Sequence, residues 1–200
     1  DGTDLASQTC ISRGFTGGTL ACSSGCASFN TSGCTSYFQP EANIEAESGT
    51  LTGMQTGVSG SDTYVYASTD NTGSASFAFN IQNPGQYKIE ARVNNNNDGG
   101  QNSFFVGLDS EPAQGNVYYT YHLFPLQTGF YWDNVSRWGN GQTGDPPISE
   151  FDPMIWTLSQ GTHTLTFYGR EANTWLDQII LKRVTTDTTP PAAPSGVRVN

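Results

Sequence analysis

The sequence predicts an all-β protein, and its composition and periodicity lead to this class. The chain of 200 residues contains 23 Gly, and aromatic residues make up 12% of it while charged residues make up only 13%. Turn-forming, β-branched and aromatic residues are typical of sheets and their connections, and no stretch shows the apolar period of an amphipathic helix. We therefore expect a jelly-roll-like antiparallel β-sandwich, with a β-barrel as the second choice.

Nine segments of the central region read as strands, because each alternates or is rich in β-branched and aromatic residues. Two tight turns, residues 83–86 (Asn-Pro-Gly-Gln) and 159–162 (Ser-Gln-Gly-Thr), join successive strands. The predicted strands are 43–47, 64–67, 75–81, 87–93, 103–108, 130–135, 154–158, 163–168 and 176–184.

The turns also sort the connections between the two ends of the sandwich. If both tight turns lie at one end, strict alternation of strand direction sends the longer connections to the other end. That end would be rich in Asn, Asp, Gly and aromatic residues, which is the chemistry of a binding site built on loops. The connections expected there are 68–73, 94–100, 138–149 and 171–174.

Residues 1–37 form a separate module that contains every cysteine of the chain, Cys10, Cys22, Cys26 and Cys34. Four closely spaced cysteines among Gly, Ser and Thr predict disulfides in an oxidising compartment. A four-thiolate zinc site is the weaker alternative, because the chain lacks the paired C-x₂-C knuckles of such sites. Four cysteines allow three pairings, and the spacing does not choose among them.

The sandwich domain is predicted over residues 38–184, and residues 185–200 form a Thr/Pro linker. Residues 194–199 resemble the start of a truncated fibronectin type III domain. Because the chain begins abruptly at Asp1, we expect a monomeric piece of a longer secreted or cell-surface protein with covalently linked neighbouring modules. The net charge of -10 argues against a nucleic-acid partner, and no apolar run reaches the length needed for membrane insertion.

Three acidic residues from opposite ends of the sandwich domain suggest a cation site. Glu45 and Glu47 alternate in a predicted strand, so both side chains would lie on one face, and Asp177 lies in the last strand. If these strands meet, three crowded carboxylates need a hard cation with oxygen ligands, and calcium fits best. The alternative is two solvated faces that never meet.

A series of motifs follows in order along the sandwich domain. The motifs are Ile44-Glu45-Ala46-Glu47, Gly85-Gln86-Tyr87, Ala91-Arg92-Val93, residues 102–106 with Asp109, Trp156-Thr157-Leu158, residues 161–165 and Leu176-Asp177-Gln178-Ile179. Their order resembles the carbohydrate-binding modules of families 6 and 35, over residues 41–184. This resemblance implies a galactose-binding-like sandwich that is not itself an enzyme, a structural calcium at Glu45, Glu47 and Asp177, and a sugar site on the loops. Asn173, four residues before Asp177, matches the Asn that hydrogen-bonds sugar hydroxyls in these families.

Aromatic rings suit a sugar site because the C–H face of a pyranose is apolar and its rim is polar. The candidate stacking residues are Trp132, Trp138, Trp175, Tyr64 and Tyr66. Burial in the core is the alternative for Trp132 and Tyr64, which lie in strand-like runs. The aromatic segment 110–150 is longer than the corresponding connection of the family, and Trp175 replaces a small or aliphatic residue there.

The function predicted from these observations is a polysaccharide-binding module attached to a polysaccharide-degrading enzyme. The amino-terminal module resembles a cysteine-rich repeat of secreted bacterial proteins, which keeps a structural or adhesive spacer without glycan binding as the alternative. Catalysis within this chain is not expected, because the acidic residues have no placed partner and neither His122 nor His163 lies near a nucleophile motif.

Overall fold

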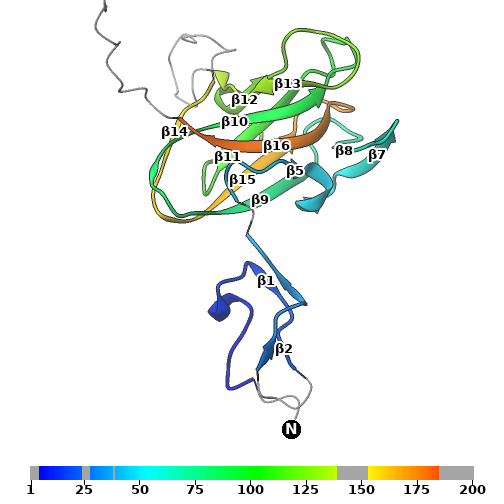
Figure 1. Ribbon diagram of the computed structural model, residues 1–200. Helices are drawn as coiled ribbons and strands as arrows, with labels where there is room; N and C mark the ends of the chain where they lie inside the picture. Colours follow the sequence, from blue (N-terminus) through cyan, green and yellow to red (C-terminus); the bar gives the residue numbers. More distant parts are fainter. Residues whose placement is uncertain (1–4, 24–27, 38, 139–152, 185–200) are drawn as a thin grey trace, which may run out of the picture.

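A computed structural model describes residues 5–23, 28–37, 39–138 and 153–184. The sandwich domain consists of two antiparallel sheets packed face to face (Figure 1), which confirms the predicted fold class. The seven-stranded sheet has the order β13-β10-β16-β8-β7, with β14 paired to β10 and β5 paired to β16. Its strands are β5 (Ile44–Glu45), β7 (Gln55–Ser59), β8 (Asp62–Tyr66), β10 (Gly85–Asn94), β13 (Tyr131–Asn134), β14 (Trp156–Leu158) and β16 (Trp175–Arg183).

The second sheet has five strands in the order β12-β11-β15-β9-β6. It consists of β6 (Thr50–Thr52), β9 (Ser74–Ile81), β11 (Ser103–Leu108), β12 (Thr120–His122) and β15 (Gly161–Gly169). The described helical segments are short 3₁₀ turns, η1 (Ile11–Arg13), η2 (Ala46–Ser48) and η3 (Val117–Tyr119). Within the described residues, none of these is long and apolar enough to cross a membrane.

The core lies between the two sheets and follows from the alternation of side chains along each strand. In β9, Ala75, Phe77, Phe79 and Ile81 are buried while the residues between them face outward. The rings of Phe77 and Phe104 each meet Phe167 edge-to-face, with centroids 6.3 Å and 5.8 Å away. Apolar burial of this kind supplies most of the favourable free energy of folding.

Each of the nine predicted strands overlaps a strand of the structure, and the alternation rule missed β6, β7 and β12 of the sandwich. The largest error is at 43–47, where β5 ends at Glu45 and the 3₁₀ turn η2 follows. The turn forms because the Ser48 hydroxyl donates to the Glu45 carbonyl at 2.5 Å and the Gly49 N–H donates to the Ala46 carbonyl at 3.2 Å. The predicted single strand face carrying Glu45 and Glu47 is therefore wrong.

A β-bulge interrupts β16 where it pairs with β10. Arg92 lies opposite Gln178 and Val93 lies opposite Leu176, so Asp177 is the extra residue. Leu176 and Ile179 both belong to the core, although strict alternation cannot place residues three apart on one face. The bulge resolves this conflict by changing the phase of the strand at Asp177.

The ends of the sandwich are arranged as the turns predicted. Gly161 pairs with Ile81, and Gly85 pairs with Leu158, so both tight turns lie at one end. The connections 68–73, 94–100 and 171–174 lie together at the other end and are tied by hydrogen bonds described below. Residues 139–149 of the fourth predicted connection lie outside the described residues.

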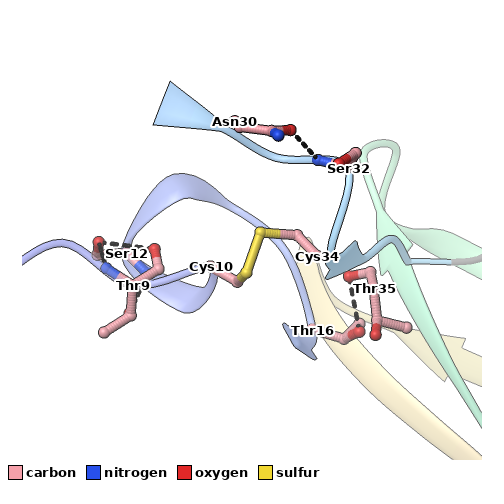
Figure 2. The surroundings of a disulfide bond; sticks show 8 residues. All are labelled: Thr9, Cys10, Ser12, Thr16, Asn30, Ser32, Cys34 and Thr35. Atoms are coloured by element: carbon pink, nitrogen blue, oxygen red, sulfur yellow. Dashed lines mark hydrogen bonds between the residues drawn. A yellow bond between two sulfur atoms is a disulfide. The ribbon is translucent and has the colours of Figure 1, made fainter. Parts of the chain in front are cut away.

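The cysteine-rich module contains four two-residue strands, paired as β1 (Gly17–Gly18) with β4 (Cys34–Thr35) and β2 (Ala21–Cys22) with β3 (Phe29–Asn30). A disulfide joins Cys10 to Cys34, with their Cα atoms 5.5 Å apart (Figure 2). Oxidation of two of the four cysteines rules out the four-thiolate zinc alternative. The participation of Cys22 and Cys26 in a disulfide stays a prediction, because Cys26 lies outside the described residues. The predicted linker 185–200 also lies outside them.

Candidate functional site

Three connections meet at the loop end of the sandwich, around Asn173. The Ala172 N–H donates to the Asp70 carboxylate at 2.7 Å, and the Asn96 side chain donates to the Asn173 carbonyl at 3.2 Å. The Asn173 N–H donates to the Ala67 carbonyl at 2.9 Å. These bonds fix the backbone of Asn173 in the left-handed region, with φ of 58°, which Asn tolerates better than most residues, and leave the residue exposed.

An aromatic cluster lies beside this loop on the outer face of the seven-stranded sheet. The rings of Tyr64 and Trp175 are stacked, with centroids 4.1 Å apart and planes inclined by 16°. Tyr66 lies 5.8 Å from Tyr64, and Phe130 lies 5.9 Å from Tyr64 and 6.0 Å from Trp175. The rings face outward because Val65, between the two tyrosines, points into the core.

A glycine in the neighbouring strand makes room for Tyr64. A Cβ atom added at Gly57 of β7 would lie 2.5 Å from Cζ of Tyr64, far inside van der Waals contact. The ring therefore lies directly over Gly57, and its own exposure is only 9%. Burial raises the pKa of the Tyr64 hydroxyl, and the nearby Tyr66 hydroxyl adds to the rise. The ring of Tyr64 thus packs between the sheet and the ring of Trp175, while Trp175 and Tyr66 are half-buried.

The five predicted aromatic residues do not all lie together. Tyr64, Tyr66 and Trp175 belong to the cluster, and the sequence did not single out its fourth member, Phe130. Trp132 is 41% exposed on the edge strand β13, in register with Arg92 of β10. Trp138 lies apart from the cluster and meets His122 edge-to-face at 6.1 Å.

A cavity of about 370 Å³ opens at the same end of the molecule, between the connection 94–102 and the segment after β12. Phe124 and Leu126, exposed by 57% and 42%, form its apolar side. Arg170 and Glu171 form its charged side and are paired at 2.6 Å. The wall is completed by Gly99, Asn102, His122 and Leu123.

Asn95 organises the cavity from inside the protein, where it is completely buried. Its amide donates to the Pro125 carbonyl at 3.0 Å and to the Tyr131 hydroxyl at 2.9 Å. Its side-chain oxygen accepts from the backbone N–H groups of Gln127 at 3.0 Å and Asn97 at 3.1 Å. One buried amide therefore holds two connections together, a role that the run of four asparagines in the sequence did not reveal.

Asp133 of β13 is a titratable group beneath the cavity. Its Oδ2 accepts from the Tyr121 hydroxyl at 3.0 Å and from the Phe124 N–H at 3.4 Å. Burial raises the pKa of the Asp133 carboxyl to about 6, and these hydrogen bonds counteract only part of the rise. Tyr121 is fully buried, and this burial raises the pKa of its hydroxyl. The negative charge of Asp133 is the second cause of the rise.

The three carboxylates expected to hold calcium do not form one site as they are arranged. Asp177, which is 1% exposed, accepts a hydrogen bond from Arg92, and the Gln178 amide donates to Glu45 Oε1 at 2.7 Å. Among the described residues, no group of three Asp, Glu, His or Cys side chains is placed to hold a metal. Glu47 Oε2 is buried without a hydrogen-bond partner in the described part of the chain, but one unpartnered carboxylate oxygen does not make a calcium site, which needs six to eight oxygens. Calcium remains a prediction, and the described geometry does not fit a site that includes Asp177.

Among the described residues, the neighbours of His163 resemble a hydrolase triad in composition. Its Nδ1 lies 2.8 Å from Asp109 Oδ2, and its Nε2 lies 3.4 Å from the Ser159 hydroxyl. Nε2 lies closer to the carbonyl oxygen of Ser159, at 3.0 Å, and this oxygen can only accept a hydrogen bond. A ring N–H directed at that oxygen is not a base that activates the Ser159 hydroxyl. The contacts join the tight turn before β15 to the loop after β11, which supports the structural role predicted for His163.

Comparisons with known proteins place this architecture. No protein-family model and no curated protein matches the chain. A β-(1,4)-mannanase of Podospora anserina with GH26 and CBM35 modules is 19% identical over 75% of this chain, with a TM-score of 0.52. The C-terminal CBM6 of the laminarinase LamC of Zobellia galactanivorans is 20% identical, covering 71% of this chain and 98% of that module, with a TM-score of 0.49. A family 35 module of Clostridium thermocellum is 11% identical over 72% of this chain and 99% of its own, also at 0.49.

The likeness to the mannanase, at a TM-score of 0.52, shows that the chain shares a β-sandwich fold with part of that enzyme. At these identities the likeness establishes the fold alone. The match spans 28% of the mannanase, so the activity of that whole enzyme does not transfer to this chain.

Proposed function

We propose that this chain is a non-catalytic carbohydrate-binding module of a secreted multimodular protein, and that it binds polysaccharide at its loop end. The observation that carries the proposal is the aromatic cluster of Tyr64, Tyr66, Phe130 and Trp175 beside the exposed Asn173. A stacked Tyr–Trp pair offers a rigid apolar surface, and a carboxamide at its rim offers a donor and an acceptor to hydroxyls.

The two parts of the site would perform different tasks. A pyranose ring would stack on the half-buried Trp175, which Tyr64 holds in place, so little side-chain freedom would be lost on binding. Asn173 would recognise the hydroxyls at the edge of the sugar, because its backbone is fixed by bonds to the two neighbouring connections. The cavity of about 370 Å³ lies at the same end and could accept a further unit of the polymer.

Titration calorimetry against a panel of soluble β-glucans, mannans and xylans, with affinity electrophoresis as a second method, tests the proposal. Asn173→Gly is the sharper variant at this position, because Gly adopts a φ of 58° without the strain that Ala would add. We expect it to weaken binding at least tenfold, which corresponds to loss of one well-placed hydrogen-bonding group. Trp175→Leu should abolish measurable binding by removing the stacking surface.

Asn83→Ala is the matched control, since this exposed Asn lies on the tight turn at the opposite end. Trp132→Ala and Trp138→Ala separate the cluster from the two remaining predicted aromatic residues. Unchanged affinity in both Asn173→Gly and Trp175→Leu, with unchanged melting temperatures, would refute the site. An intact protein that binds no glycan on the panel or on a broad array would instead favour the structural or adhesive spacer.

A further inference from the structure

Arg92 of β10 lies at the centre of a charged group on the outer face of the seven-stranded sheet. One terminal nitrogen of its guanidinium donates to Asp177 of β16, and the other donates to Asp62 of β8 at 2.9 Å. The side chain of Arg92 is 24% exposed, against 1% for Asp177 and 31% for Asp62. A single guanidinium therefore bridges two carboxylates from two other strands.

The bulge in β16 explains why Asp177 needs this partner. As the extra residue of the bulge, Asp177 is buried beside the sheet and loses contact with water. Burial raises the pKa of the Asp177 carboxyl, and the bond from Arg92 counteracts that rise. A buried carboxylate without a cation would be strongly destabilising, because its lost hydration would not be replaced.

The planar fork of an arginine suits this position better than the geometry of a calcium ion. Calcium takes six to eight oxygen ligands in a shell of about 2.3–2.6 Å, which three carboxylates and several carbonyls or waters would have to supply. Here Asp177 is engaged by Arg92, Glu45 is engaged by Gln178, and Glu47 lies on the 3₁₀ turn η2 instead of the strand. The guanidinium supplies the positive charge and directed donors without any ligand shell.

We propose that the guanidinium of Arg92, and not a metal ion, is the cation that neutralises Asp177 and ties the last strand of the sandwich to β8 and β10. The guanidinium carbon also lies 4.8 Å from the centre of the Phe130 ring, in cation–π contact. Phe130 in turn packs against Tyr64 and Trp175. Arg92 therefore also contacts the aromatic cluster through Phe130.

Melting temperature measured with and without a chelator, and with calcium added back, tests this assignment without any glycan. For the wild-type chain we expect the same Tm in all three conditions. Arg92→Gln should lower Tm by roughly 5–10 °C, because it breaks an ion pair with one fully buried member. Added calcium should not restore the loss in this variant, because the described carboxylates form no group of three that could hold a metal.

Lys88→Gln is the matched control. Lys88 lies on the same strand as Arg92, away from the bulge, and its ammonium lies 2.8 Å from the Glu90 carboxylate. We expect this variant to leave Tm within about 2 °C of wild type, as for other partly exposed pairs. If Arg92→Gln does not fold, Arg92→Lys serves instead. Its ammonium keeps the positive charge but cannot reproduce the fork to two carboxylates, so the loss of Tm should be smaller than the one expected for Arg92→Gln.

A wild-type Tm that falls with chelator and recovers with calcium would overturn the proposal in favour of the predicted metal. So would an Arg92→Gln or Arg92→Lys protein as stable as wild type, or an Arg92→Gln protein whose Tm calcium restores to the wild-type value. None of these readouts depends on sugar binding, so the assignment of Arg92 and the proposed function can fail independently.

Discussion

Replacing Asp133 by Asn should flatten the pH dependence of stability. The raised pKa of about 6, against the ordinary 3.8, means that the folded protein holds the Asp133 proton more tightly than the unfolded chain does. This contribution to stability is complete below about pH 4 and is lost as the pH rises through about 6. The gap between the two pKa values corresponds to at most about 3 kcal/mol, of which about 2.4 kcal/mol falls between about pH 4 and pH 7.5. Because Asn carries no charge at any pH, Asp133→Asn removes this loss while keeping an oxygen that can accept from Tyr121.

Urea unfolding of the wild type and of Asp133→Asn at about six pH values from 4 to 7.5 measures the effect. The free energies of unfolding are compared as a difference at each pH, so that every other titrating group cancels. We expect Asp133→Asn to gain about 2 kcal/mol relative to wild type between about pH 4 and pH 7.5. A difference that stays constant within about 0.5 kcal/mol would refute a raised pKa, and a difference of opposite sign would mean that the carboxylate is stabilised by its donors.

Four other substitutions test how the elements are held. Gly57→Ala should cost about 1–3 kcal/mol in urea unfolding, because the new Cβ would lie 2.5 Å from the Tyr64 ring. Gly17→Ala, where a Cβ meets nothing within 4 Å, should cost less than about 1 kcal/mol. Cys10→Ser opens a loop whose ends are 24 residues apart and should lower the local stability of the cysteine-rich module by about 3 kcal/mol, measured by hydrogen exchange, with the sandwich unchanged. Asn95→Ala removes a buried amide with four hydrogen-bond contacts and should cost roughly 3 kcal/mol by urea unfolding, so a cost below about 1 kcal/mol would contradict its organising role.

The sequence predicted those parts of the fold that depend on local alternation. β9 and β10 were found because their apolar side chains recur every second residue over at least six residues. The same rule failed for β7 (Gln55–Ser59), whose side chains are mostly exposed on both faces, since the strand forms by pairing with β8 at the edge of the sheet. It failed at Glu47 because a Ser hydroxyl and a Gly N–H favoured a 3₁₀ turn over continued strand.

The candidate site was predictable to the extent that strands carry it. Tyr64 and Tyr66 share an outer face that alternation defines, whereas Trp175 faces outward only because of the bulge at Asp177. The loop end follows from the positions of the two tight turns. Phe130 and the cavity were not predictable in this way. Their positions depend on side-chain bonds between distant connections, such as those of Asn95 to Pro125 and Gln127, which have no local sequence period.

The bulge at Asp177 reverses which residues of the final strand face outward: odd-numbered ones on one side of the bulge and even-numbered ones on the other. Beyond it toward the loop, odd-numbered residues such as Trp175 face outward, whereas on the other side Gln178 and Lys182 face outward instead. Without the extra residue's displacement, continued alternation from Gln178 would send Asp177 into the core and Leu176 to the surface. A protein engineer who grafts new loops onto this scaffold should therefore count residues from the bulge, because its position determines which side chains the last loop presents.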